Sequence, residues 1–231
     1  MIKEFKSKIL EIKKITEDTS IFRLSIPRNF EFKAGQYVLL GFDIEGKRMN
    51  RAYSIASSPN KKEFIELCIK KVGHKRVSDK IHELKKGDEI LVKGALGNFV
   101  IQNKKEDLFF IAAGTGIAVF RSMIPFLLET NFNKKITLLK SSRYEKTSLY
   151  DEYFSDLQRK HKNFTFHDIF SKPKDNNYQD KGHVQDFIEK YLQENFKRDF
   201  YICGLPEMVD EVKEKLESLG ISKDRIFFEK Y

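Results

Sequence analysis

Apolar and polar residues alternate along the first hundred residues of the chain. Short runs in which every second residue is apolar end at clusters of Gly, Pro, Asn or Asp. Six strands at this spacing are typical of an antiparallel barrel. We expect them at residues 8–15, 21–26, 36–42, 51–57, 63–72 and 89–93. A short helix is expected to interrupt them at 77–84, because three apolar residues share one helical face there, namely Val77, Ile81 and Leu84.

The pattern of apolar and polar residues changes after a polar linker at 102–107. Short apolar runs now alternate with helical patterns, which predicts a parallel, doubly wound sheet of five strands. The expected strands are 108–112, 136–140, 164–169, 200–203 and 226–229, and the expected helices are 117–129, 149–161, 184–195 and 206–219. Gly220 suits the C-terminal end of the last helix. The pattern therefore predicts two domains, 1–101 and 108–231.

Composition supports two ordinary globular domains and argues against a membrane segment. The chain has 231 residues, of which 40% are hydrophobic and 21 are Phe. Its longest apolar run, 108–120, contains two glycines and falls short of the about 20 residues that a membrane helix needs. The first residues lack the apolar segment of a signal peptide. We expect a cytoplasmic protein that does not insert into membranes.

Cysteine, histidine and charge limit the chemistry further. Two cysteines are too few for a disulfide framework or a four-thiolate cluster, and the five histidines show no metal-binding spacing. We expect no protein-bound metal, so any iron–sulfur centre belongs to a partner. The net charge of +9 indicates either a solvated, lysine-rich surface or attraction of an acidic protein partner. No basic helix with interleaved aromatics favours nucleic acid.

The run Arg51-Ala52-Tyr53-Ser54 combines three side chains that suit a flat, anionic cofactor. Arg supplies a forked donor for phosphate oxygens, Tyr a face for stacking, and Ser a small donor or acceptor for a ring edge. The alternative is an amphipathic strand with an exposed Arg.

Gly114-Thr115-Gly116 follows an apolar strand and opens a helix. Glycine lets a ligand approach the backbone, and a helix N-terminus offers free amides to phosphate. This context favours a dinucleotide site over a tight turn.

Cys203-Gly204 closes the fourth parallel strand, and ligands of such sheets bind at the carboxyl ends of the strands. The alternative is that Cys203 is a buried small residue before a turn.

The second parallel strand is followed by Ser142 and Arg143 and by no acidic residue before Glu145. In doubly wound folds an acid at this place suits a free 2′-hydroxyl and an Arg suits a 2′-phosphate. The sequence therefore favours NADPH, with NADH left open.

Residues 73–78 run from a strand into a helix start. Ser78 fits an N-cap, and the alternative is a second pyrophosphate contact with Lys75 and Arg76 nearby.

Five motifs in register resemble those of the ferredoxin–NADP⁺ reductase superfamily across nearly the whole chain. They are Arg51-Ala52-Tyr53-Ser54 (RxYS), residues 73–78 (the second flavin-phosphate motif), 94–99 (GPxGxF), 114–118 with 121–123 (GTGIAPxRSM) and 203–208 (CGxPxM). Ala95 and Val119 stand where the family pattern has Pro, which removes no ligand group.

The resemblance implies an FAD-binding barrel (1–101), an NAD(P)-binding α/β domain (108–231) and a set of site residues. In that set Arg51 pairs with flavin phosphates, Tyr53 stacks on the flavin and Ser54 lies near its N5. The implied cofactor-binding residues are Arg51, Tyr53, Ser54, Ile69, Lys70, Gly73, Val77, Ser78, Gly114, Thr115, Gly116, Ser142, Arg143, Cys203, Gly204 and Tyr231. The implied catalytic residues are Ser54, Cys203, Glu229 and Tyr231, the last by its likeness to a terminal Tyr that covers the flavin in the plant-type branch.

The implied function is hydride transfer from NAD(P)H to FAD, followed by single-electron transfer to a separate acidic carrier, ferredoxin or flavodoxin. No cysteine-rich extension follows, so the acceptor is expected to be separate. Two alternatives stay open: an NAD(P)H:flavin reductase that releases reduced flavin, and a non-catalytic electron-relay subunit. The residues leave FAD against FMN and the oligomeric state open.

Overall fold

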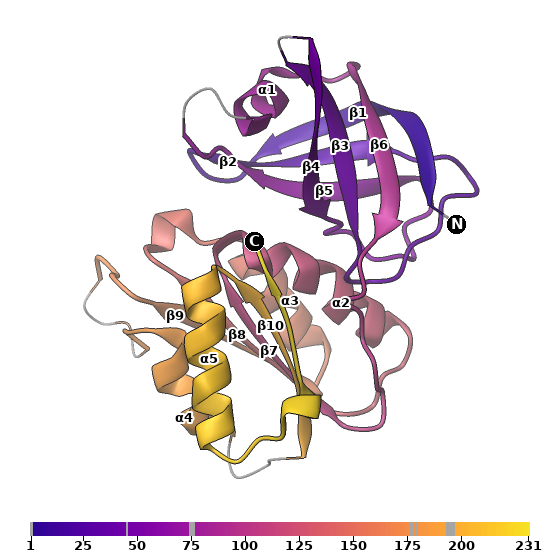
Figure 1. Cartoon of the computed structure of the whole chain (residues 1–231). Helices are drawn as coiled ribbons and strands as arrows, with labels where there is room; N and C mark the ends of the chain where they lie inside the picture. Colours follow the sequence, from indigo (N-terminus) through magenta and orange to yellow (C-terminus); the bar gives the residue numbers. More distant parts are fainter. Residues whose placement is uncertain (1, 45, 74–76, 176–177, 179, 193–196) are drawn as a thin grey trace. The chain divides into compact units, whose positions relative to one another are not determined.

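The computed structural model describes the chain apart from residues 1, 45, 74–76, 176–177, 179 and 193–196, and forms two compact units (Figure 1). The first unit comprises residues 1–100 and 121–126, and the second comprises 101–120 and 127–231. No helix of the described residues is both long and apolar enough to cross a membrane.

The first unit is an antiparallel six-stranded sheet that curls into a barrel, as the sequence predicts (Figure 1). Its strands lie in the order β4-β3-β6-β1-β2-β5, and an isolated bridge between Ile55 and Leu67 joins the two outer strands. The bounds are β1 Lys3–Lys14, β2 Thr19–Ser25, β3 Tyr37–Ile44, β4 Lys47–Ser54, β5 Phe64–Lys70 and β6 Glu89–Leu96.

The barrel core is made by the alternate apolar residues of these strands. Phe22, Val38, Leu67 and Val92, from four different strands, are at most 2% exposed. Burying one such side chain stabilises the fold by about 1.5–3 kcal/mol. The period-two pattern is therefore the cause of the barrel, because it places every second residue inside.

Several details of the first unit differ from the sequence-based expectation, and β1 already begins at Lys3 instead of residue 8. Strand β4 begins at Lys47, earlier than expected, because it is an outer strand whose first residues are mostly exposed and show no apolar alternation. Helix α1 (Val77–Glu83) contains Ser78 as its second residue, so the N-cap prediction is wrong. The Ser78 hydroxyl instead accepts a hydrogen bond from the Val72 amide at 3.2 Å.

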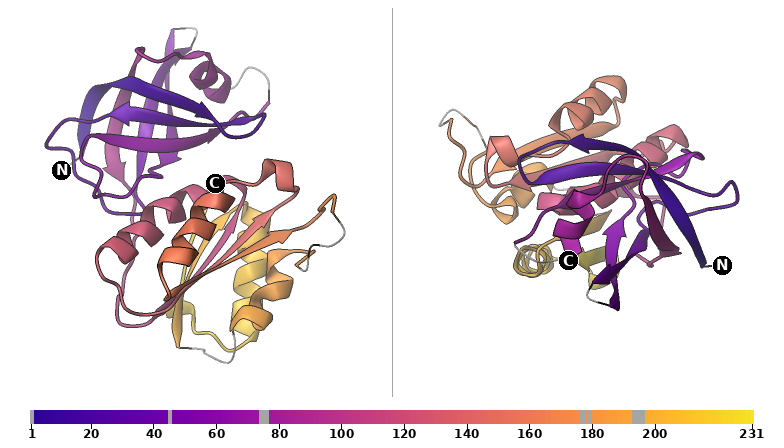
Figure 2. Two further views of the ribbon diagram at one scale, coloured as in Figure 1. Left: turned by 180° about the vertical axis from the view of Figure 1, so that it is seen from behind. Right: turned by 90° about the horizontal axis from the view of Figure 1, so that it is seen from above.

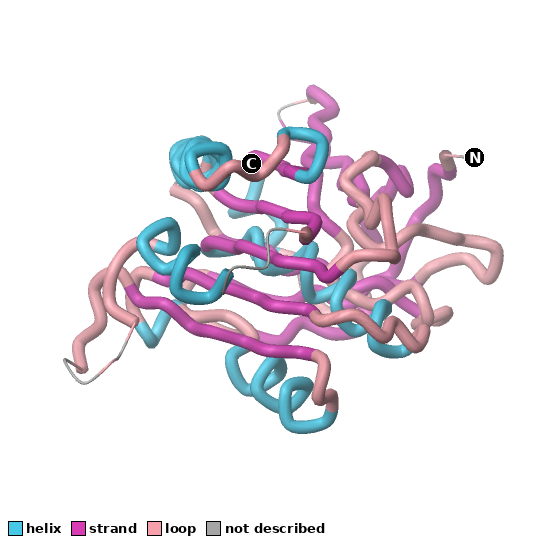
Figure 3. Tube along the Cα trace, turned by 90° about the horizontal axis from the view of Figure 1, so that it is seen from below, coloured by secondary structure: helices cyan, strands magenta, loops and turns pink. Residues whose placement is uncertain are grey.

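The second unit is a parallel five-stranded sheet, again as predicted. The strands lie in the order β11-β10-β7-β8-β9, and helices lie on both sides of the row (Figure 3). Helices α4 and α5 cover one face and α3 covers the other (Figure 2). The bounds are β7 Asp107–Ala113, α2 Ile117–Glu129, β8 Ile136–Ser142, α3 Asp151–Lys160, β9 Phe164–Phe170, α4 Ile188–Leu192, β10 Arg198–Gly204, α5 Pro206–Ser218 and β11 Ile226–Lys230.

The third expected helix of this unit begins four residues later than the pattern indicates. A 3₁₀ turn, Val184–Phe187, precedes α4, and the expected last residues, 193–195, lie outside the described residues. Gly220 has φ +82° and follows α5 in the left-handed conformation, which confirms the predicted helix end.

Candidate active site

The order of the parallel strands creates a topological switch point between β7 and β10. From β7 the chain proceeds to β8 and β9 on one side, and then returns across to β10 and β11 on the other. Ligands of open parallel sheets bind outside the carboxyl ends of the strands at such a point. Gly114-Thr115-Gly116 follows β7 here, and Cys203-Gly204 ends β10.

Gly116 allows the two segments to lie in direct contact. A Cβ atom at Gly116 would be 2.3 Å from the Cys203 carbonyl oxygen, and one at Gly204 would be 3.3 Å from the Ala113 Cβ. At Gly116 no larger residue fits without displacing the backbone of Cys203. The Gly-Thr-Gly segment forms a 3₁₀ turn that leads straight into α2, with Gly114 at φ +55°.

The side chain of Tyr231 lies on this turn. Its hydroxyl donates to the Ala113 carbonyl at 2.7 Å and accepts from the Gly116 amide at 3.1 Å. The amide that the sequence assigns to a phosphate is therefore bonded to Tyr231 in this structure. Whether the ring also covers a flavin stays a prediction.

Cys203 and Glu229 lie opposite each other on β10 and β11. Cys203 is 2% exposed, and burial together with the nearby Glu229 raises the pKa of its thiol. Burial also raises the pKa of the Glu229 carboxyl. The site therefore presents a neutral thiol instead of a thiolate nucleophile, next to a carboxyl group that retains its proton more readily than an exposed one.

In the barrel, Arg51, Tyr53 and Ser54 lie at the end of the outer strand β4. The Arg51 guanidinium is exposed and donates only to the Asn50 carbonyl among the described residues, at 3.3 Å. Burial raises the pKa of the Tyr53 hydroxyl to about 12. A forked cation with no carboxylate partner in the described chain suits a phosphate, and the half-buried Tyr ring suits stacking.

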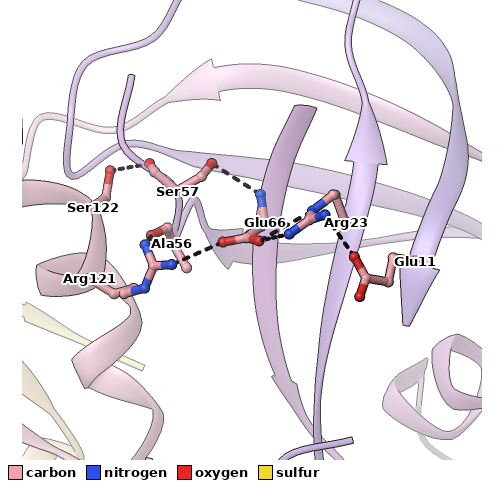
Figure 4. A network of polar contacts seen from close by, with 7 residues as sticks. All are labelled: Glu11, Arg23, Ala56, Ser57, Glu66, Arg121 and Ser122. Carbon is pink, nitrogen blue, oxygen red and sulfur yellow. Dashed lines mark hydrogen bonds and ion pairs between the residues drawn. The ribbon is translucent and has the colours of Figure 1, made fainter. Parts of the chain in front are cut away.

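The residues just after Ser54 are held by a network that the sequence did not reveal (Figure 4). The Glu66 carboxylate lies between Arg23 and Arg121, at 2.8 and 3.3 Å. Arg121 also donates to the Ala56 carbonyl at 3.3 Å.

Main-chain bonds complete this network. The Ala56 amide donates to the Glu66 carbonyl at 2.7 Å, and the Glu66 amide donates to the Ser57 hydroxyl at 3.1 Å. The hydroxyl of Ser122, the neighbour of Arg121, donates to the Ser57 carbonyl at 2.6 Å. Glu66 thus fixes the segment that follows the predicted flavin strand through both its backbone and its side chain.

Where the structure describes them, the side chains of the other residues predicted to contact the flavin are buried, paired or absent, so they suit flavin binding less well than those of Arg51 and Tyr53. Ile69 is fully buried in the barrel core, and Lys70 forms an ion pair with Asp18 at 3.2 Å. Gly73 has φ +75°, and Ser78 is 5% exposed. Lys75 and Arg76 lie outside the described residues, and the side chain of Val77 is also not described.

The carboxyl end of β8 carries Ser142 and Arg143. The Arg143 guanidinium is exposed and lies 5.4 Å from the centre of the Tyr144 ring. Sequence reasoning missed what lies beside them: Lys140 is 1% exposed and contacts Asp151 and Asp168. Nothing in the local pattern signals this cluster, because a lysine inside an apolar strand normally indicates a polar face.

Comparison with known proteins agrees with this geometry. Two family models match: an oxidoreductase FAD-binding domain over residues 6–101 and an oxidoreductase NAD-binding domain over residues 110–214. The phenol hydroxylase P5 protein of Acinetobacter pittii is 30% identical over 238 residues, covering 100% of this chain and 66% of the relative. The sulfhydrogenase 1 gamma subunit of Pyrococcus furiosus is 32% identical over 229 residues, covering 95% of this chain and 77% of the relative.

The chain belongs to the ferredoxin–NADP⁺ reductase superfamily. The fold of a solved ferredoxin NADP⁺ reductase from Neisseria gonorrhoeae, with bound FAD and NADP, agrees with a TM-score of 0.88 at 23% identity, covering 99% of this chain and 98% of that one. The two matched domain families give FAD and NADP or NAD as the cofactors of this oxidoreductase. The chain spans 66% of the length of its Acinetobacter relative.

The described residues fit both cofactors. Arg51 offers exposed guanidinium donors that no carboxylate of the described chain occupies, which suits the FAD phosphates. Gly116 and Gly204 keep the switch point lined by backbone, which suits a nicotinamide nucleotide.

Proposed function

We propose that this reductase transfers hydride from NAD(P)H to FAD and then passes single electrons to a separate, acidic carrier protein such as a ferredoxin or flavodoxin. The observation that carries the proposal is the backbone contact between Gly116 and Cys203 at the switch point, in a chain whose outer barrel strand bears Arg51 and Tyr53. Bound FAD supplies the chemistry, because it accepts a hydride and releases electrons one at a time.

The residues of the barrel bind and orient the FAD. Arg51 binds phosphate oxygens, Tyr53 stacks on the flavin, and the Ser54 hydroxyl lies at the ring edge. Ile69, Lys70, Gly73, Val77 and Ser78 contribute the backbone around the flavin pyrophosphate. Because the pKa of Tyr53 is raised by burial, its hydroxyl stays protonated at neutral pH.

On the nucleotide side, Gly114, Thr115 and Gly116 receive the phosphates, and Ser142 and Arg143 contact the adenine ribose. Cys203 and Gly204 border the nicotinamide. The raised pKa of the Cys203 thiol keeps that group neutral at this border, and the raised pKa of the Glu229 carboxyl lets it hold a proton more readily than an exposed one. Tyr231 competes for the Gly116 amide and so regulates access to the turn.

Stopped-flow absorbance tests the proposal. The purified protein should carry bound flavin, and NADPH or NADH should bleach its absorbance in a single mixing experiment. An acidic ferredoxin or flavodoxin should then restore the absorbance. Failure of both nucleotides to bleach the flavin would overturn the proposal.

A second candidate is an electron-relay subunit of a larger oxidoreductase, and the similarity to the Pyrococcus sulfhydrogenase gamma subunit favours it. A stable complex with other subunits after purification, together with no turnover of free carrier protein, would support it. Loss of the flavin on gel filtration would instead support an NAD(P)H:flavin reductase.

A further inference from the structure

Lys140 is a buried cation that the proposed hydride transfer does not use. It lies on β8, is 1% exposed, and its Nζ is 5.7 Å from the centre of the Phe166 ring on β9. Lysine is almost never this buried unless it is paired, because an isolated buried ammonium is strongly destabilising. The identity of its partners therefore matters.

Two carboxylates and a hydroxyl surround Lys140. Asp168 is its register partner on β9 and lies 3.0 Å away, and Asp151, the first residue of α3, pairs with it from the other side. Lys140 also contacts the Ser148 hydroxyl, which donates to Asp151 at 2.8 Å. The cluster thus ties together β8, β9 and the start of α3.

The cluster lies at the base of the segment expected to contact the ribose. The Ser148 hydroxyl is also 3.2 Å from that of Ser142, the last residue of β8. The chain leaves the cluster at Ser142, passes through Arg143 and returns at Ser148. In a doubly wound sheet the end of this second strand faces the adenine ribose, where negative charge favours a 2′-hydroxyl over a 2′-phosphate.

Lys140 determines the net charge of the cluster beside the expected ribose site. With both carboxylates ionised, the cluster carries one negative charge with Lys140 and two without it. A 2′-phosphate brings about −1.5 to −2 charges of its own, whereas a 2′-hydroxyl brings none. The free energy of binding NADPH therefore depends on the cluster charge much more than that of binding NADH.

We propose that Lys140 is a specificity-determining positioning residue, which offsets the charge of Asp151 and Asp168 and thereby sets how well the reductase accepts NADPH relative to NADH. The inference rests on the proposed function only in that Ser142 and Arg143 contact the ribose. It differs from direct recognition by Arg143, which is exposed and has no part in the buried cluster.

The test measures the Kd of NADP⁺ and NAD⁺ by titration of the flavin spectrum, and compares kcat/KM for NADPH and NADH, at about pH 9. This pH lies well above the pKa of about 7 of Asp168, which loss of Lys140 would raise further. In Lys140→Met the NADPH:NADH ratio should fall about three- to tenfold, mainly through the KM for NADPH. In Asp151→Asn the ratio should rise. Asp151 is 40% exposed and Asp168 still pairs with Lys140 in this variant, so Asp151→Asn should perturb the fold less than Lys140→Met.

Lys223→Met is the matched control, because Lys223 pairs with Glu217 at 3.4 Å in the turn before β11, at the amino end of the parallel strands and so opposite the ribose end, and should leave the ratio unchanged. Lys140→Arg, which keeps the charge, should restore the parent ratio. Equal losses for both nucleotides in Lys140→Met, or an unchanged ratio in Asp151→Asn, would overturn the inference. If neither nucleotide reduces the parent protein, the proposed function fails instead.

Discussion

At the scale of single residues, Tyr231 makes the most direct contact with the predicted nucleotide site. Its hydroxyl bonds to both the carbonyl before the Gly-Thr-Gly turn and the amide at its end. A nucleotide that binds the Gly116 amide has to break the second bond. A hydrogen bond of this kind contributes about 0.5–1.5 kcal/mol, so the competition is measurable.

We therefore expect Tyr231→Phe to lower the Kd for NADP⁺ and NAD⁺ about two- to tenfold. Titration of the flavin spectrum with NADP⁺ and NAD⁺ measures this. Tyr191→Phe is the control, because it removes a hydroxyl bonded to Asp180, far along the chain from the turn, and should leave the Kd unchanged. Weaker nucleotide binding in Tyr231→Phe would show that the hydroxyl supports the site and does not compete for it.

Asp168 gives a second residue-scale prediction, on the pH dependence of stability. Burial, and to a smaller extent the nearby Asp151, raise its pKa to about 7, against a restraining effect of Lys140. Because the folded pKa exceeds the unfolded value, the folded state holds the proton more tightly. This contribution to stability is complete below the unfolded pKa of about 4 and is lost as the pH rises to about 7.

Asp168→Asn should therefore reduce the drop in Tm between about pH 5 and pH 7.5 by about 3 °C. Thermal unfolding at the two pH values measures the difference. Asp210→Asn is the control: Asp210 is exposed and its pKa is lowered by Lys230, so it is ionised at both pH values. The same pH slope in Asp168→Asn and the parent would contradict the assignment.

At the scale of elements, the segment that follows β4 is held by contacts that join β5 to β2 and to residues of α2. Glu66 on β5 is 11% exposed and pairs with Arg23 and Arg121 (Figure 4). Removal of its charge takes one carboxylate away from two partly buried guanidinium groups. Arg23 also pairs with Glu11, which is 49% exposed, and this ion pair stabilises the fold less than the Glu66 pairs do.

Glu66→Gln should lower the free energy of unfolding of the barrel by about 2 kcal/mol, and Glu11→Gln by less than about 1 kcal/mol. Denaturant titration, followed by the fluorescence of released flavin, reports on this unit separately. Equal effects of the two substitutions would show that the network contributes no more than a surface ion pair.

The elements also show how far sequence reasoning extends. Helix α2 has the bounds that the pattern predicts, because an apolar strand, a Gly-rich turn and a helix are all local signals. Strand β4 and helix α4 differ from the prediction, because an exposed outer strand has no apolar alternation and a 3₁₀ turn has no distinct period. The Glu66 and Lys140 clusters could not be predicted, since their partners come together only through the register of distant strands.

At the scale of the whole molecule, the sequence predicts two units because the apolar period changes from two residues to alternating strands and helices. The contact pattern assigns residues 121–126 of α2 to the first unit, within a helix that begins in the second. No sequence period signals this, because the helix is continuous. Its Arg121 and Ser122 contact backbone carbonyls that follow the flavin strand.

Net charge is the molecular property that bears on the electron acceptor. The chain carries +9, so an acidic carrier should associate with it faster than a neutral acceptor does. At about 0.15 M salt the Debye length is about 8 Å, and surface attraction is screened further as salt rises.

The rate at which an acidic ferredoxin reoxidises the reduced flavin should therefore fall at least about tenfold between about 0.02 M and 0.5 M salt. Reoxidation by a neutral quinone, measured in the same stopped-flow experiment, should change less than about twofold. Parallel salt dependence of the two acceptors would mean that the lysine-rich surface only keeps the protein solvated, and that recognition of the carrier depends on shape instead of charge.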